Sequence, residues 1–135
     1  MVLNILCIGT PKVIGDSVGP RVGTLLKELK LPSINIIGTM KDPVHRLNYV
    51  DKLKLISHDV PTICVDAAVG STGIKIVNGP MVPGAAVMPG GPSIGDVSIY
   101  CYVGTTLEDI LHCCEATAQS LAIEAVEAIT TLLAD

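Results

Sequence analysis

Two aspartates occupy positions where a carboxyl group could take part in catalysis. Asp16 ends a glycine-containing stretch, GTPKVIGD, and Asp66 interrupts an apolar run, TICVDAAV. At the start of a predicted helix, exposed N–H groups and the helix dipole favour the ionised form of Asp16. Burial in an apolar strand should instead raise the pKa of Asp66. Two carboxyl groups shifted in opposite directions can share one proton, so that one activates water while the other protonates an oxygen or a leaving amine.

Several residues near these aspartates could hold a substrate. Glycine lets the backbone approach a ligand closely, and its N–H group can bind a developing oxyanion. The candidate substrate-binding residues are Gly9, Thr10, Gly15, His45 and Gly70. Structural interpretations stand beside these: Asp16 as a helix cap, Asp66 bonded to a nearby loop, and His45 as a first-turn histidine bonded to its own loop. The loop matches neither a dinucleotide-binding nor a Walker A pattern, so no nucleotide cofactor is expected.

The strands that must position these residues are short and apolar. Continuous apolar runs predict buried strands over residues 2–8, 33–38 and 62–69, and a later strand over 96–103. Between the last two of these strands the pattern changes. Short runs at 73–79 and 84–88 indicate a β excursion made of antiparallel or edge strands.

Helices are predicted between the strands and at the end of the chain. A first helix begins with Asp16 or Ser17 as its cap and runs to about Leu29. A second begins at Asp42-Pro43 and carries an apolar stripe over residues 44–55. The C-terminal segment 107–134 has a helical composition, with a break expected near residues 113–116.

This order of elements predicts one α/β domain over residues 1–135, with a three-layer α/β/α fold and a mostly parallel, doubly wound sheet. In such sheets ligands bind beyond the carboxyl ends of the strands, where the winding direction changes. If the second and third strands flank the first, that point lies between the first and third strands. Asp16 and Asp66 would then both lie at this crevice.

Composition excludes several classes of protein. The net charge is −4, 49% of the residues are hydrophobic, and the only aromatic residues are three tyrosines. A nucleic-acid partner is not expected, because neither a basic face nor a set of stacking aromatic residues is present. No apolar run is long enough to cross a membrane.

The cysteines indicate a reducing compartment. Their number is five, and no two are spaced as CxxC, which argues against a disulfide framework or a zinc site. Cys7, Cys64 and Cys101 lie in apolar runs, where cysteine acts as a small hydrophobic residue. We therefore expect a cytoplasmic protein without a cofactor.

Four blocks of sequence, in order, resemble one known family. They are CIGTPKVIGDSVGPRVG, GTMKDPVHRLN, CVDAAVG and GPMVPGAAV followed by PSIGDVSI. Together they resemble the YyaC-type sporulation proteases, which are similar to the germination protease of spore-forming bacteria and to the hydrogenase maturation endopeptidases. The resemblance implies a three-layer fold, a forespore location within the cytoplasm, and a pair of catalytic aspartates at the positions of Asp16 and Asp66.

The same resemblance bears on metals and substrates. Hydrogenase maturation endopeptidases bind nickel through two acidic residues and a later histidine, but residues 92–97 contain no histidine here, so no metal is expected. Sporulation relatives carry a lysine after the GAAV block, where this chain has Met88. The implied partners are peptides or small acid-soluble spore proteins, and a homo-oligomer is left open.

Three functional hypotheses follow. The first is an endopeptidase that hydrolyses peptide bonds with water and the pair Asp16 and Asp66, with Asp66 holding the proton and Asp16 as base, or the reverse. The second is an inactive protein that binds a peptide or partner on the same fold. The third is a metal-dependent maturation protease.

Overall fold

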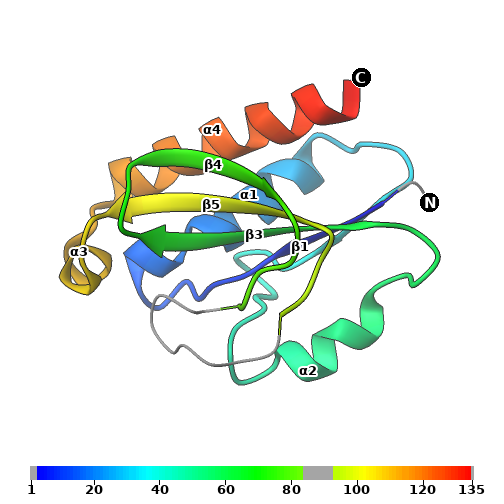
Figure 1. Cartoon of the computed structure of the whole chain (residues 1–135), viewed down its shortest axis with the longest axis horizontal. Coiled ribbons are helices and arrows are strands. Elements are labelled where there is room, and N and C mark those ends of the chain that lie inside the picture. Colours follow the sequence, from blue (N-terminus) through cyan, green and yellow to red (C-terminus); the bar gives the residue numbers. More distant parts are fainter. Residues whose placement is uncertain (1–2, 84–92, 135) are drawn as a thin grey trace.

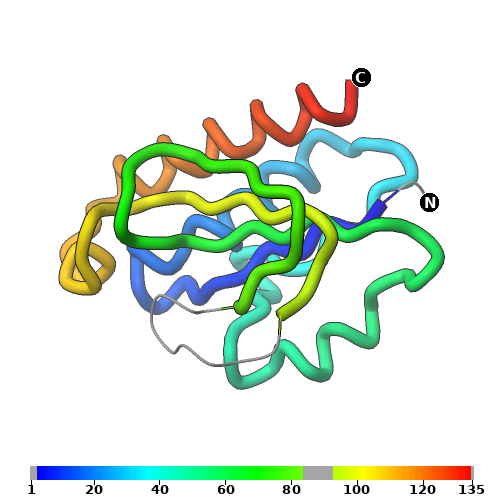
Figure 2. The backbone as a smooth tube through the Cα atoms, in the orientation of Figure 1, coloured from blue at the N-terminus to red at the C-terminus, as the bar shows by residue number. Residues whose placement is uncertain are grey.

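A computed structural model of the chain describes residues 3–83 and 93–134, and in it five strands form one sheet (Figure 1). Their order across the sheet is β2-β1-β3-β5-β4. The strands are β1 (Leu3–Cys7), β2 (Ile34–Ile37), β3 (Thr62–Val69), β4 (Gly73–Asn78) and β5 (Val97–Gly104). The pairs β1–β2, β1–β3 and β3–β5 are parallel, whereas β4 runs antiparallel to β5 at the outer edge (Figure 2).

This strand order confirms the predicted topology. β2 lies on one side of β1 and β3 on the other, so the winding direction changes between β1 and β3. The predicted edge strand over residues 73–79 is β4. The apolar run at 84–88 lies outside the described residues.

One face of the sheet is covered by the two long helices, α1 (Val18–Glu28) and α4 (Glu115–Ala134) (Figure 1). Alternate residues of the central strands, such as Ile5, Val65 and Ile99, are buried under these helices. Small residues of α4 let it lie close to the sheet, because their side chains occupy little space between the two layers. Those buried alanines are Ala118, Ala122 and Ala125.

The opposite face is covered by shorter pieces, which are α2 (Tyr49–Lys52), the 3-10 turn η2 (Leu53–Leu55) and the loop before them (Figure 1). Leu6, Ile8 and Cys64 of the sheet pack there against Val44 and Tyr49 of that segment. With α1 and α4 on the other side, this gives the predicted mostly parallel α/β sheet with helices on both faces.

The helix predicted over residues 42–55 is largely wrong. Residues 42–48 form a loop, because Val44 pairs with Ile8 as an isolated parallel bridge and is fully buried. Asp42 does not cap a helix, and its Oδ1 lies instead 2.5 Å from Lys52 Nζ in a salt bridge. The strand-like pairing of Val44 therefore replaces the first turns of the predicted helix.

The other helix ends differ only locally from the prediction. Asp16 lies in a 3-10 turn, η1 (Ile14–Asp16), and Ser17 precedes α1 without a side-chain cap bond. The C-terminal helix breaks where expected, into α3 (Leu107–His112) and α4, with a capping box at Thr106 that begins α3. Within the described ranges, no helix is both long and apolar enough to span a bilayer.

Candidate active site

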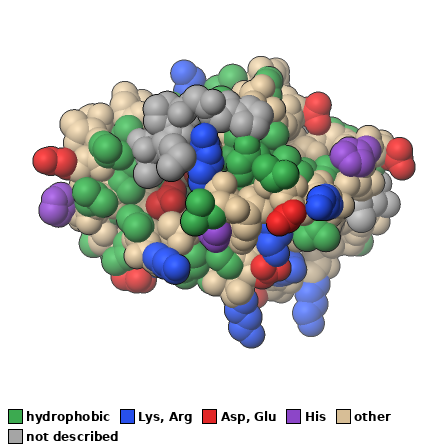
Figure 3. Space-filling view, turned by 90° about the horizontal axis from the view of Figure 1, so that it is seen from below, with side chains coloured by type: hydrophobic (Ala, Val, Ile, Leu, Met, Phe, Trp, Pro, Cys, Tyr) green, Lys and Arg blue, Asp and Glu red, His purple; other side chains and the backbone are tan. Residues whose placement is uncertain are grey.

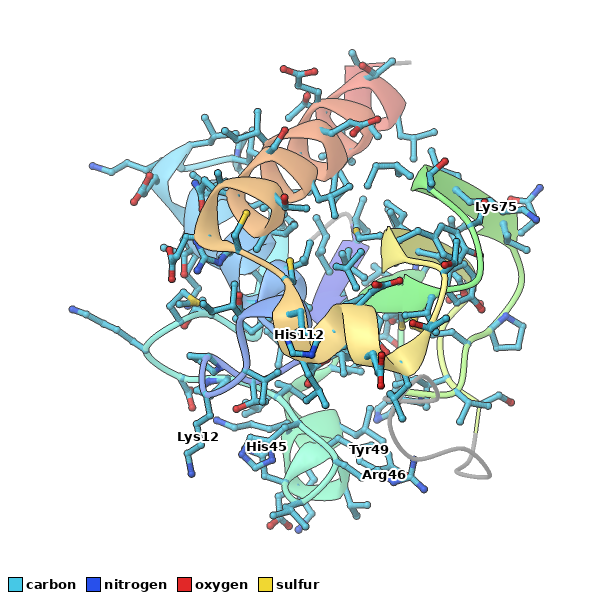
Figure 4. All side chains as sticks on the ribbon, turned by 90° about the vertical axis from the view of Figure 1, so that its left-hand side faces the viewer. Lys12, His45, Arg46, Tyr49, Lys75 and His112 are labelled. Atoms are coloured by element: carbon cyan, nitrogen blue, oxygen red, sulfur yellow. The ribbon has the colours of Figure 1, made fainter. Side chains whose placement is uncertain are left out.

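A cavity of about 530 Å³ lies at the carboxyl ends of β1 and β2. One wall is the loop after β1, residues 9–16, and the other is the segment 43–47 after β2. Figure 4 views this end of the molecule, and Lys12 and His45 lie near one another there. The cavity is lined by the apolar residues Ile8, Pro11, Val13, Pro43 and Leu47 and by Gly9, Thr10, Lys12, Asp16, His45 and Arg46.

Backbone hydrogen bonds join the two walls of this cavity. The Gly9 N–H donates to the Val44 carbonyl oxygen at 2.8 Å, which extends the bridge between Ile8 and Val44. Within the first wall, the Thr10 N–H donates to the Asp16 carbonyl oxygen at 2.9 Å. A side chain at position 9 would place its Cβ 2.1 Å from that oxygen, so only glycine fits there. These hydrogen bonds hold the backbone of both cavity walls in place.

Asp16 lines the cavity, as the sequence predicts, but its ionisation differs from the prediction. Burial raises its pKa from 3.8 to about 6, and a hydrogen bond from the Thr10 backbone offsets part of this effect. The expected lowering by a helix start fails because Asp16 lies in η1, before α1 begins. A carboxyl group with a pKa near neutrality is suited to general acid–base chemistry.

Helix α3 contributes to the burial around Asp16 by packing on η1. Gly15 is buried there, and a Cβ at this position would lie 2.2 Å from the Ile110 carbonyl oxygen. Gly15 thus brings α3 into contact with the turn that carries Asp16. It is not among the described residues that line the cavity.

Asp66 lies on β3 beneath the cavity and is 3% exposed. Leu6 pairs with Cys64 across β1 and β3, so the register continued by two residues places Asp66 beside Ile8, which lines the cavity. On its other side Asp66 pairs with Tyr100 of β5. Asp66 is not among the described residues that line the cavity. Its neighbour across the strand pair, Ile8, does line it.

His45 faces the cavity with a defined hydrogen-bonding pattern. Its Nδ1 accepts a hydrogen bond from the Leu47 N–H at 3.2 Å, so a neutral imidazole carries its proton on Nε2. The His45 N–H donates to Asn48 Oδ1 at 2.8 Å, which fixes the loop. The expected bond between His45 and its own loop is present, and His45 is one of the residues that line the cavity.

The backbone N–H groups of three predicted substrate-binding residues are hydrogen-bonded within the protein. The Gly9 and Thr10 N–H groups bind Val44 and Asp16 carbonyl oxygens, as described above. The Gly70 N–H donates to the Gly104 carbonyl oxygen at 3.0 Å, and Gly70 lies at the exposed end of β3, away from the cavity lining. The structure therefore brings together Gly9, Thr10, Asp16 and His45, and leaves Gly15 and Gly70 outside.

Sequence reasoning missed Lys12, Val13, Arg46 and Leu47, which also line the cavity. Arg46 Nη1 donates to the Pro83 carbonyl oxygen at 3.1 Å. The sequence could have indicated these four residues only through their positions, since each lies within four residues of Asp16 or His45. Asp96, in contrast, is a structural turn residue, whose Oδ2 accepts the Thr62 N–H at 2.8 Å.

Over residues 3–83 and 93–134, no three His, Cys, Asp or Glu side chains are grouped so that they could hold a metal ion. Cys7, Cys64 and Cys101 are free and buried, as predicted. Burial, followed by the nearby Asp66 carboxyl group, raises the pKa of Cys64 to about 12.

Comparisons with known proteins agree with the architecture. A family model described as "Protein of unknown function (DUF1256)" matches residues 2–134. "Uncharacterized protein YyaC" of Bacillus subtilis (strain 168) is 43% identical over 102 residues, covering 70% of this chain and 50% of that protein. The chain thus spans about half the length of this curated relative.

Two solved structures share the fold. The [NiFe] hydrogenase maturation protease HycI from Thermococcus kodakarensis KOD1 has a TM-score of 0.65 and 25% identity, covering 99% of this chain and 93% of that one. An uncharacterized protein from Wolinella succinogenes has a TM-score of 0.57 and 16% identity, covering 98% and 96%. The predicted resemblance to YyaC and to the maturation proteases is confirmed.

Proposed function

This chain belongs to the family described as "Protein of unknown function (DUF1256)", and from that premise we propose that it is a peptidase that uses Asp16 and Asp66 to hydrolyse peptide bonds. The likeness to HycI, a maturation protease, supports a protease-like fold. The observation that carries the proposal is Asp16, which lines a 530 Å³ cavity and has a pKa of about 6.

In this mechanism Asp16 is the general base. Its carboxylate takes a proton from water while the water oxygen attacks the carbonyl carbon of the substrate. Since the pKa of Asp16 is about 6, most Asp16 carboxylates are ionised at neutral pH and still basic enough to accept that proton. The developing oxyanion needs a hydrogen-bond donor beside it.

In this proposal His45, which lines the cavity, donates a hydrogen bond to this oxyanion. Its Nδ1 accepts from Leu47, so the neutral ring presents Nε2–H. The Gly9 and Thr10 amides bind other oxygens and do not compete for this role. We assign His45 to oxyanion stabilisation and not to proton transfer.

Asp66 completes the cycle as the acid. It protonates the leaving amine as the C–N bond breaks, and a proton then returns from Asp16 to Asp66 through water. Two carboxyl groups that are coupled in this way titrate as one unit, so the acid and base roles belong to the pair. Reaching the amine requires the substrate to bind over Ile8, beside which Asp66 lies.

The cavity favours a peptide with an apolar side chain. Its apolar lining consists of Ile8, Pro11, Val13, Pro43 and Leu47. Small acid-soluble spore proteins are the substrates implied by the family resemblance, and they are the natural first test. Removing an apolar side chain from water at this wall would supply binding free energy of about 25 cal/mol per Å² of buried area.

The deciding experiment is a cleavage assay read by mass spectrometry. The native protein is incubated with small acid-soluble spore proteins beside Asp16→Asn, Asp66→Asn and a control, Asp59→Asn, whose side chain is exposed and outside the cavity. We expect cleavage by the native protein and by Asp59→Asn only. Cleavage by both Asp16→Asn and Asp66→Asn would rule out the aspartate pair.

A binding protein on the same fold is the second candidate. One observation favours it: the N–H groups of Gly9, Thr10 and Gly70 donate to carbonyl oxygens within the protein and do not point to a bound oxyanion. Tight binding of the same substrates without products, measured by titration calorimetry, would support this candidate over the peptidase.

A further inference from the structure

The outer edge of the sheet has a strand in which a single lysine is the protection against pairing with another strand. Among the described residues β4 pairs only with β5, which leaves its other side without a strand (Figure 2). Edge strands are normally blunted by proline, by bulges or by charged side chains, especially lysine. The run Gly73–Asn78 contains no proline and one charge, Lys75, and its pairing with β5 has no register shift.

The backbone groups on the open side of β4 can be assigned. The Gly79 N–H donates to the Asp96 carbonyl oxygen at 2.8 Å, in line with the β4–β5 register, so residue 79 faces β5. Because backbone groups alternate in direction along a strand, those of Gly73, Lys75 and Val77 face β5 as well. The N–H and carbonyl groups of Ile74, Ile76 and Asn78 therefore face outward.

The side chain at the centre of this edge is apolar and exposed. Ile76 pairs with Ile99, which is buried under α1 and α4, yet Ile76 itself is 44% exposed. Ile74 packs against the same core. The outward-facing backbone therefore lies beside an exposed isoleucine on the helix-covered face of the sheet.

We propose that β4 pairs antiparallel with β4 of a second copy of this chain, across a two-fold axis at Ile76. A two-fold interface places the same patch on both subunits, and an antiparallel pair of identical strands satisfies that symmetry. With Ile76 opposite Ile76, residues 73–79 of one copy pair fully with residues 79–73 of the other. The two sheets become one continuous sheet.

The charge pattern argues against the neighbouring register centred on Lys75. Centring the pair on Lys75 would place two like charges directly opposite each other, which destabilises cross-strand pairing. Centring it on Ile76 places Lys75 opposite Val77 and pairs the two exposed isoleucines. Residues Ile74 and Asn78 then exchange backbone hydrogen bonds with each other across the axis.

This interface leaves the proposed active site open. Lys75 lies on the opposite side of the molecule from Lys12 and His45 in Figure 4. The association is therefore independent of the proposed peptidase activity, and either can fail without the other.

Sedimentation equilibrium over about 1–100 µM tests the association, since a small interface gives a weak dimer. We expect the mass to rise from 14.0 kDa toward twice that value. Ile76→Lys places like charges on the axis and should weaken association about tenfold or more. Leu29→Lys, at a side chain that is 50% exposed near the end of α1, is the matched control and should leave it unchanged.

Crosslinking tests the register. Directly opposite, hydrogen-bonded residues of an antiparallel pair have Cα atoms about 5.5 Å apart, within the range of a disulfide. In a Cys114→Ser background, which removes an exposed thiol, Ile76→Cys should crosslink on mild oxidation and Lys75→Cys should crosslink far less. A monomer at all concentrations, a dimer that Ile76→Lys does not weaken, or equal crosslinking at both positions would overturn the proposal.

Discussion

Asp16 binds a proton more tightly in the folded protein than in the unfolded chain, because burial raises its pKa from 3.8 to about 6. The protonated form therefore stabilises the fold. This contribution is fully present below about pH 4 and is lost as the pH rises through 6. A difference of about two pH units corresponds to at most about 3 kcal/mol.

Asp16→Asn should consequently make the protein more stable at pH 7.5, by about 1–3 kcal/mol, while abolishing cleavage. It should also flatten the pH dependence of the free energy of unfolding between pH 4 and 6. Urea denaturation at pH 4.5 and 7.5 measures both effects. Asp59→Asn is the control and should behave as the native protein, and a less stable Asp16→Asn at pH 7.5 would contradict the role of burial.

His45 offers a second test at the same scale. His45→Ala removes the Nε2–H donor from the cavity and should lower kcat by about 10²–10³, the loss seen on removing one oxyanion donor. KM should change little, because the donor acts mainly in the transition state. Steady-state kinetics measure this split, with His58→Ala, at an exposed position, as control. Equal losses in both variants would remove His45 from the mechanism.

Residue types and spacing were enough to identify Asp16, Gly9, Thr10 and His45 as neighbours of a cavity. The ionisation of Asp16 could not be predicted, because its burial includes the packing of α3 on η1, more than ninety residues along the chain. Nor could the bonding of the glycine amides be predicted, since Val44 and Gly104 are distant in sequence. Local patterns carry no information about such contacts.

The packing of helix α3 on turn η1 holds the turn that carries Asp16. Gly15→Ala would place a Cβ 2.2 Å from the Ile110 carbonyl oxygen, so α3 must move away from η1. We expect a loss of about 1–3 kcal/mol in the free energy of unfolding. The pKa of Asp16 should fall as its burial decreases, and NMR titration measures this.

Gly70→Ala is the comparison for that substitution. Among the residues that the structure describes, no atom lies within 4 Å of the added Cβ, but Gly70 has a φ of +110°, so we attribute the effect to backbone conformation. A loss of about 1 kcal/mol and an unchanged Asp16 pKa are expected. If Gly15→Ala behaved in the same way, the contact between α3 and η1 would not support Asp16.

Elements whose apolar pattern is continuous were predicted well. β3 spans residues 62–69 in both the prediction and the structure, and the break before α4 was also found. The helix over residues 42–55 failed because Val44, at a helical spacing from Leu47, instead pairs with Ile8 and extends the sheet. Tertiary pairing outweighed a good local helix signal there.

At the scale of the whole molecule, amide hydrogen exchange reports both the stability of the sheet and its proposed pairing with a second copy. The central strands β1 and β3 lie under two covered faces, and their amides should exchange slowest. If β4 pairs across the two-fold axis, the amides of Ile74, Ile76 and Asn78 should exchange more slowly as protein concentration rises. Lys75 and Val77, bonded to β5, should not respond, and NMR exchange rates at two concentrations compare them.

The residues that line the cavity differ in how much they contribute to the stability of the fold. Leu47 is 91% exposed although it lines the cavity, so replacing it alters what a substrate meets at little cost in stability. The bond from Gly9 to Val44 fixes the wall independently of that side chain. Under the proposed peptidase activity, substitutions at position 47 can change which side chain the cavity accepts while the backbone of its wall stays in place, so substrate preference can evolve without a loss of stability.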